Sequence, residues 1–141
     1  MILMGVALVW TANGLCFTLV ALRMSSEQFA TYEIGIVTTG YFIGQIICAG
    51  FLENVISKVG NIRAFAALAS TVSAGVICYA LYVDIFVWFL IRVLHGSCIA
   101  GLLLVVESWL NGIVSINYRG RLISIYVVTQ SIAFSLGQQL L

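Results

Sequence analysis

The chain has 141 residues, of which 62% are hydrophobic and only 8% are charged. An average soluble domain is about a quarter charged, so this composition excludes a soluble globular protein and indicates an integral membrane protein. The formal net charge is +1, with no basic or acidic block, which excludes nucleic acid as a partner because phosphate binding needs clustered Lys and Arg.

Long apolar stretches predict five membrane-spanning helices, because about 20 apolar helical residues cross a bilayer. We expect these helices at about 1–22, 34–52, 64–82, 85–107 and 122–141. The predicted fold is all-α and polytopic, with residues 1–141 in a single transmembrane domain. The first stretch is too long for the apolar region of a signal peptide, so we expect it to stay in the mature protein.

The first two predicted helices contain few polar residues, and each is informative. A carboxamide near the middle of the membrane, as at Asn13, either hydrogen-bonds a neighbouring helix or contacts a solute. In the second helix Gly40, Gly44 and Cys48 recur every four residues, which predicts a ridge on which another helix can lie closely. Gln45 adds one polar group beside this ridge.

The connections and the cysteines predict no catalytic or metal chemistry. Glu53 to Arg63 is predicted to be an aqueous loop, with a turn of positive φ at Gly60. Asp84 is predicted to close a very short hairpin into the fourth helix. The cysteines lack the CxxC spacing of zinc or redox sites and are expected to be small packing residues. They are Cys16, Cys48, Cys78 and Cys98.

The fourth predicted helix differs from the others because it contains Arg92, His95 and Glu107. An ionisable group inside the hydrocarbon costs at least about 2.5 to 3.5 kcal/mol, so each needs a partner or water. At about 100° per residue, these side chains and Gly96 lie on one face of the helix. We expect this face to meet other helices or a watery cavity rather than lipid.

Each ionisable residue of this helix has two interpretations. Arg92 either lines a cavity, where it pairs with an anionic solute or a titrating carboxylate, or extends its charge to the outer headgroups. His95 either relays protons or makes a hydrogen-bonded helix contact. Glu107 is either a gate or loop anchor near Arg119 and Arg121 or a coupling carboxylate.

The basic residues between the predicted helices indicate an orientation. Four of them, Lys58, Arg63, Arg119 and Arg121, lie in loops on one side, whereas the other side has only Arg23. Short loops rich in Lys and Arg are retained in the cytoplasm. The amino terminus is therefore predicted to be cytoplasmic.

Several motifs, in this order and spacing, resemble the major facilitator superfamily. Lys58-Val-Gly60-Asn-Ile-Arg63 follows the second helix, and Arg92-Val-Leu-His-Gly96 lies in the fourth. Within the superfamily, the sequence resembles the bacterial YcaD-type transporters more closely, and the resemblance covers essentially the whole chain. The further matching motifs are Asn13-Gly14, Thr18-Leu19, Arg23, Tyr41-Phe42-x-Gly44, Glu107-Ser-Trp-Leu-Asn111, Arg119-Gly120-Arg121, Tyr126 and Gly137-Gln138.

Two departures from the superfamily pattern affect what the resemblance implies. The first-loop motif usually has Gly and Asp where this chain has Glu53 and Ser57, so the usual contact of that Asp with the other half is in doubt. Glu53 is one candidate to take the place of that Asp, at a displaced position. The chain contains no proline and so lacks the Gly-Pro motif of drug/proton antiporters, which leaves antiport unsupported.

The resemblance implies secondary active transport of a small solute by alternating access across a bacterial cytoplasmic (inner) membrane. The family fold has two six-helix halves with substrate near the midplane, so this chain is expected to be a fragment that contains most of one half. Its expected partners are the lipid bilayer, a small solute and the second half; the coupling ion stays open, with a proton as one option. No enzyme activity, cofactor or metal is expected. The candidate solute or coupling residues are Arg92, Asn13, His95 and Gln45, and the candidate gate or loop residues are Glu53, Lys58, Gly60, Arg63, Glu107, Arg119 and Arg121.

Two other classes compete with transport. A membrane scaffold or assembly protein that transports nothing would use the same polar residues only to hold helices together, and it is the main alternative. A channel would need a ring of filter residues or a repeated pore motif, and the sequence has neither.

Overall fold

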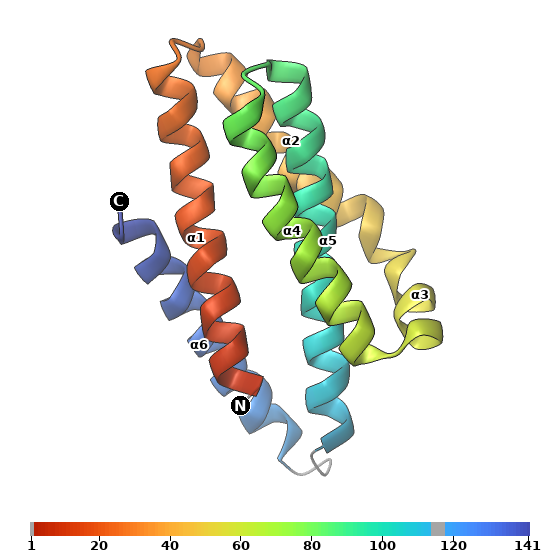
Figure 1. Cartoon of the computed structure of the whole chain (residues 1–141). Helices are drawn as coiled ribbons and strands as arrows, with labels where there is room; N and C mark the ends of the chain where they lie inside the picture. Colours follow the sequence, from red (N-terminus) through yellow and green to blue (C-terminus); the bar gives the residue numbers. More distant parts are fainter. Residues whose placement is uncertain (1, 114–117) are drawn as a thin grey trace. The chain divides into compact units, whose positions relative to one another are not determined.

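A computed structural model describes residues 2–113 and 118–141, and within these ranges the chain is α-helical and has no strand. The prediction of an all-α fold is confirmed. Figure 1 shows the helices in chain order. They are α1 (Ile2–Ser26), α2 (Thr31–Ala49), α3 (Leu52–Val59), α4 (Asn61–Leu81), α5 (Ile85–Ile113) and α6 (Arg119–Gln139).

Three helices in the described part of the chain are long and apolar enough to cross a membrane. These candidate spans are Leu3–Ser26, Asn61–Leu81 and Ile85–Gly112. The three spans support a multi-pass membrane protein. The predicted count of five is not confirmed, and together with the single transmembrane domain it stays a prediction.

The segment after α2, predicted to be a loop, contains the short helix α3. Its apolar residues Leu52 and Ile56 lie one turn apart and are buried against Ala64 and Val105. Gly60 then ends the helix with a φ of +90°, which confirms the predicted turn of positive φ. Eight residues with one buried pair give too short a pattern for the sequence alone to predict this helix.

Two of the long helices extend beyond the ends predicted for them. α1 continues to Ser26 rather than ending near Leu22, and α5 continues to Ile113 rather than Glu107. A helix that leaves the hydrocarbon keeps its backbone hydrogen bonds through the headgroup region, so polar residues do not mark its end.

The backbone contacts divide the chain into two compact units, Met1–Ser26 with Val106–Leu141, and Glu27–Val105. In the first unit α1 packs along α6. A Cβ added to Gly14 would lie 2.2 Å from the Phe134 carbonyl oxygen, and one added to Gly137 would lie 2.1 Å from a carbonyl oxygen of α1. The ring of Phe134 meets those of Trp10 and Phe17 edge-on, with centroids 6.3 and 6.2 Å apart. Glycine thus permits the two backbones to touch, and aromatic rings fill the sides of the contact.

In the second unit α2 and α5 cross in the same way. A Cβ on Gly44 would lie 2.0 Å from the Val93 carbonyl oxygen, and one on Gly96 would lie 1.9 Å from the Tyr41 carbonyl oxygen. Gly40 lies against Phe89, where an added Cβ would be 3.0 Å from the ring. The small-residue ridge predicted for the second helix is confirmed as the surface on which α5 lies.

Candidate functional site

The α4–α5 hairpin fixes where α5 begins. One carboxylate oxygen of Asp84, Oδ1, accepts hydrogen bonds from the backbone N–H groups of Phe86 and Val87, at 2.9 and 3.0 Å. These N–H groups have no partner inside the helix, so the carboxylate caps them and its charge lies at the positive end of the helix dipole. Asp84 therefore closes the hairpin, as its position in the sequence predicted.

Three aromatic residues, Phe29, Tyr79 and Trp88, pack together beside this hairpin, and we call them the aromatic frame. Trp88 is fully buried, and its indole N–H donates to the carbonyl oxygen of Tyr82 in the hairpin. The ring of Tyr79 meets Trp88 edge-on at 5.7 Å and 89°, and the ring of Phe29 lies 5.8 Å from Trp88. The frame thus holds the ring of Tyr79 in a fixed orientation.

Arg92 lies one turn after Trp88 on α5, and only 1% of its surface is exposed. Its guanidinium carbon lies over the ring of Tyr79, 5.8 Å from the ring centroid. A cation at this distance from an aromatic face is attracted by the negative potential of the ring, and more strongly when both are removed from water. The charge of Arg92 is therefore held inside the protein, against α4.

His95 lies three residues further along and is 2% exposed. Its ring meets that of Tyr41 at 6.0 Å and 66°. Within the described residues, neither ring nitrogen has a hydrogen-bond partner. Buried polar atoms almost always have a hydrogen-bond partner, so the two nitrogens of this imidazole are available to hydrogen-bond a further group.

The other predicted solute and coupling residues are described within their own units. Gln45 follows Gly44 on α2 and is partly buried. Asn13 is buried on α1, and Glu107 is exposed near the end of α5; both belong to the first unit. Within the second unit, the structure places Arg92 and His95 together on one buried face of α5.

The gate and loop residues with described side chains are exposed near helix ends. Lys58 lies in the last turn of α3, Gly60 separates α3 from α4, and Arg63 lies in the first turn of α4. Arg119 donates from Nη2 to the Asn111 carbonyl oxygen at 3.3 Å, which links the start of α6 to the end of α5. Arg121 is exposed in the same first turn of α6. The side chain of Glu53 lies outside the described part of the structure.

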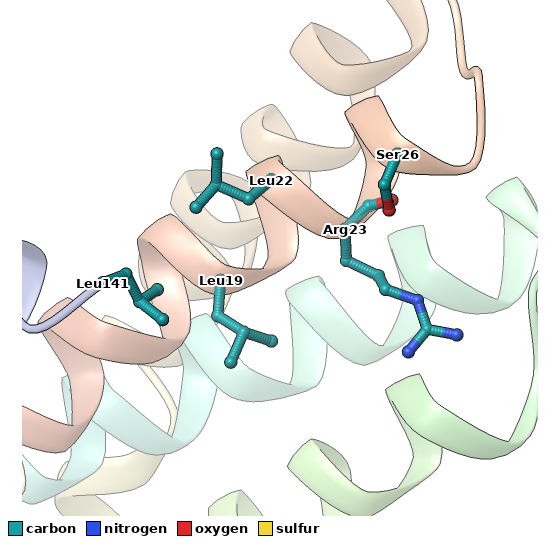
Figure 2. A pocket seen from close by; sticks show the side chains of 5 residues that line it. All are labelled: Leu19, Leu22, Arg23, Ser26 and Leu141. Atoms are coloured by element: carbon teal, nitrogen blue, oxygen red, sulfur yellow. The ribbon is translucent and has the colours of Figure 1, made fainter.

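An open cleft of about 400 Å³ lies in the first unit (Figure 2). Leu19, Leu22, Arg23 and Ser26 of α1 line it together with Leu141. Figure 2 shows the guanidinium of Arg23 directed away from Leu141. None of the candidate solute residues lines this cleft, so we do not assign the solute site to it.

Comparisons with known proteins identify the family of this chain. Residues 2–140 match the family described as Major Facilitator Superfamily. The chain belongs to the major facilitator superfamily. It is 29% identical over 140 residues to the "Uncharacterized MFS-type transporter YcaD" of Escherichia coli O139:H28 (strain E24377A / ETEC), and equally to that of strains O9:H4 (HS) and K12 / DH10B.

These alignments cover 99% of this chain but 37% of each relative, so the chain spans little more than a third of the relatives' length. No solved structure gives a significant match. The resemblance inferred from the motifs is confirmed at the level of the superfamily and of the YcaD-type relatives. The chain is a multi-pass membrane protein of this superfamily.

The sequence analysis did not identify the residues that surround Arg92. Trp88 precedes Arg92 by four residues, a spacing that places both on one helix face, so the sequence did contain a signal for that pair. Tyr79 lies on a different helix, and aromatic residues near the ends of membrane helices are common, so nothing in the sequence distinguished it. The cysteines in the described residues form no group that could hold a metal ion.

Proposed function

We propose that this chain forms part of a secondary transporter that moves a small solute across a bacterial cytoplasmic membrane by alternating access. Membership of the superfamily supports transport, and three apolar helices support a multi-pass membrane location. The observation that carries the proposal is the burial of Arg92 within α5, a helix long and apolar enough to span the membrane. A scaffold needs no such charge, because small and neutral polar residues suffice to hold membrane helices together.

Arg92 acts in this proposal as the residue that pairs with an anionic solute or a titrating carboxylate. Burying a charge in a membrane span is costly, so a buried guanidinium there indicates a functional role, and the contact with the Tyr79 ring offsets part of that cost. Contact with Tyr79 favours the inward-facing interpretation over extension of the side chain to the outer headgroups. His95, Asn13 and Gln45 remain candidates to contact the solute or the coupling ion.

The proposed working unit has five spans from this chain and a second half of similar architecture. The longer relatives support this arrangement, since the chain covers 37% of their length. Two such halves would enclose a solute site near the midplane of the membrane. Residues 1–141 reconstituted alone are then expected to transport nothing, and saturable uptake by the isolated monomer would contradict the two-half proposal.

The proposed orientation places the amino terminus and the α3 segment in the cytoplasm. In a cysteine-free background, Ser26→Cys should react with an impermeant thiol reagent in intact cells. Ser57→Cys should react only after the membrane is opened, because Lys58 and Arg63 retain their segment in the cytoplasm. Both serines are exposed at helix ends, so the two variants are matched in accessibility. The reverse pattern would contradict the orientation.

The transport proposal can be tested without knowing the solute. Proteoliposomes that contain the full-length protein are incubated with a bacterial metabolite extract, and the solutes inside are identified by mass spectrometry. The wild type should accumulate at least one solute that protein-free liposomes do not, and Arg92→Ala should lose that accumulation at equal protein content. Leu90→Ala, an exposed position on the same helix, is the matched control and should behave as wild type.

Each other outcome has a definite meaning. No accumulation beyond protein-free liposomes would contradict transport and favour the scaffold alternative. Normal accumulation by Arg92→Ala would contradict the role given to Arg92. Arg92→Lys keeps the charge but loses the planar set of donors, so partial recovery would indicate charge pairing and no recovery would indicate recognition by geometry.

A further inference from the structure

A chain of contacts that begins at the α4–α5 hairpin holds the guanidinium of Arg92. The Tyr82 carbonyl oxygen accepts the indole N–H of Trp88, Trp88 meets Tyr79 edge-on, and the Tyr79 ring lies under the guanidinium. Arginine has a long side chain with many rotamers, and immobilising it costs free energy at the moment a ligand binds. A guanidinium already held against a fixed ring loses less of that freedom on binding.

The chemistry of the Arg92 side chain indicates which ligands it could bind. The five N–H donors of a guanidinium lie in its plane, and the contact with Tyr79 involves the ring rather than these donors. A carboxylate matches two of the donors through parallel hydrogen bonds. Its negative charge also complements the buried cation.

His95 provides a second, independent observation at the same place. It lies on the same face of α5, is 2% exposed, and has both ring nitrogens without a hydrogen-bond partner within residues 2–113 and 118–141. A buried imidazole in this state has a hydrogen bond available for a bound molecule. Two polar groups on neighbouring turns, one cationic and one able to donate or accept, form a site for an anion that also has an acceptor or hydroxyl group.

We infer that Arg92 and His95 form a binding site for a small organic carboxylate, and that Tyr79 is the positioning residue that orients the Arg92 guanidinium. The inference rests on the proposed function, since it names the class of solute that Arg92 would bind. Tyr79 does not touch the solute in this arrangement. It acts through Arg92, and the rest of the aromatic frame holds it in place.

The test measures binding by thermal unfolding of the full-length protein in neutral detergent, at constant ionic strength. The probes are sodium benzoate, sodium acetate and sodium phosphate, each compared with sodium chloride. A ligand that binds only the folded state raises the unfolding midpoint in a saturable way. Benzoate or acetate should do so in the wild type and not in Arg92→Gln, and a stronger effect of phosphate than of either carboxylate would overturn the carboxylate assignment. Arg23→Gln, which also removes one positive charge, should respond as the wild type does.

Variants of Tyr79 and His95 test the positioning role. Tyr79→Leu should weaken carboxylate binding about tenfold, which corresponds to the loss of a desolvated cation–π contact. Tyr79→Phe keeps the aromatic ring and should bind the carboxylate with an affinity within about twofold of wild type. If the Tyr79 hydroxyl rather than the ring were important, Tyr79→Phe would lose affinity as Tyr79→Leu does. His95→Ala should weaken binding while leaving a response that still depends on Arg92. Tyr32→Leu, an exposed tyrosine of the same unit, is the matched control.

Several results would overturn the inference. Equal stabilisation of wild type and Arg92→Gln by carboxylates would remove Arg92 from the site. No stabilisation by any of the three anions would overturn the carboxylate assignment and is the result expected if Arg92 pairs with a protein carboxylate. If Tyr79→Leu does not fold, Tyr79→Phe and Tyr79→Trp decide: loss of binding in both would contradict the positioning role. Binding in detergent requires no transport, so carboxylate binding without solute accumulation would retain this inference and contradict the proposed function.

Discussion

The α1–α6 contact and the α2–α5 contact share one feature, a close approach of the two backbones at glycine. In each, one glycine from either helix lies against a carbonyl group of the other, at Gly14 and Gly137 in the first unit and at Gly44 and Gly96 in the second. A side chain at any of the four would place its Cβ about 2 Å from a carbonyl oxygen. The closest approach of the two helices is therefore set by a glycine pair in each unit.

The two contacts differ in what surrounds the glycines. Beside the α1–α6 contact, Phe134 packs against Trp10 and Phe17, and these rings close the sides. In the second unit, α5 instead buries Arg92 and His95, which contact Tyr79 of α4 and Tyr41 of α2. The comparison teaches that close packing and a polar site are separate properties, because the same glycine device supports an apolar seal in one unit and two ionisable side chains in the other.

The largest effect is expected from removal of the aromatic seal of the α1–α6 contact. Phe134→Ala should lower the free energy of unfolding by about 2 to 4 kcal/mol, because it removes the ring that contacts Trp10 and Phe17, and the cost lies toward the lower end for a partly buried residue. Reversible unfolding of the full-length protein in mixed micelles would measure it. Phe86→Ala, an exposed ring on α5, is the matched control and should change stability by less than about 1 kcal/mol. Equal losses at both positions would show that Phe134 does not seal the contact.

A second prediction compares the two glycine pairs directly. Gly14→Ala and Gly96→Ala should each cost about 1 to 3 kcal/mol, since the added methyl group meets a backbone carbonyl that cannot rotate away. Gly5→Ala and Gly35→Ala have open space around the added group and should be neutral or stabilising by up to about 1 kcal/mol. Gly96→Ala should also weaken carboxylate binding, because it displaces the turn that contains His95, whereas Gly14→Ala should leave binding unchanged. If Gly14→Ala impaired binding as much as Gly96→Ala, the two contacts would not be functionally distinct.

The sequence predicted much of this arrangement but not the contacts that make the site. Periodicity of about 100° per residue placed Arg92, His95 and Gly96 on one face, and the structure buries all three. The four-residue spacing of glycines predicted the surface of α2 on which α5 lies. Periodicity reports the face of one helix and not its neighbour, so the contact of Arg92 with Tyr79 of α4 could not be derived from it.

The other differences between the sequence predictions and the structure also depend on the surroundings of single residues. Glu107 shares the helical phase of Arg92 but lies more than ten residues further along α5, where it is exposed, so angle alone did not determine its surroundings. The short helix α3 is held by the burial of Leu52 and Ile56 against residues distant in sequence. The functional roles of Asn13 and Gln45 depend on neighbours that a single-helix pattern does not reveal, and those roles stay predictions.

The smallest effect is expected at Ser97, the polar group that crosses directly between α2 and α5. Its hydroxyl donates to the Gly44 carbonyl oxygen at 3.0 Å across the contact and lies 2.9 Å from the Val93 carbonyl oxygen within its own helix. Ser97→Ala loses the interhelical bond, and hydrogen bonds between membrane helices are worth about 0.6 kcal/mol on average, so the free energy of unfolding should fall by about that amount. Ser73→Ala is the control, since that exposed serine bonds only to the Ala69 carbonyl oxygen of its own helix and should cost less. A loss above about 2 kcal/mol at Ser97 would mean that this hydroxyl, and not the Gly44–Gly96 pair, holds α2 against α5. The small cost expected here follows from the glycine contact itself, because two backbones already in contact need little further attraction from a single hydroxyl group.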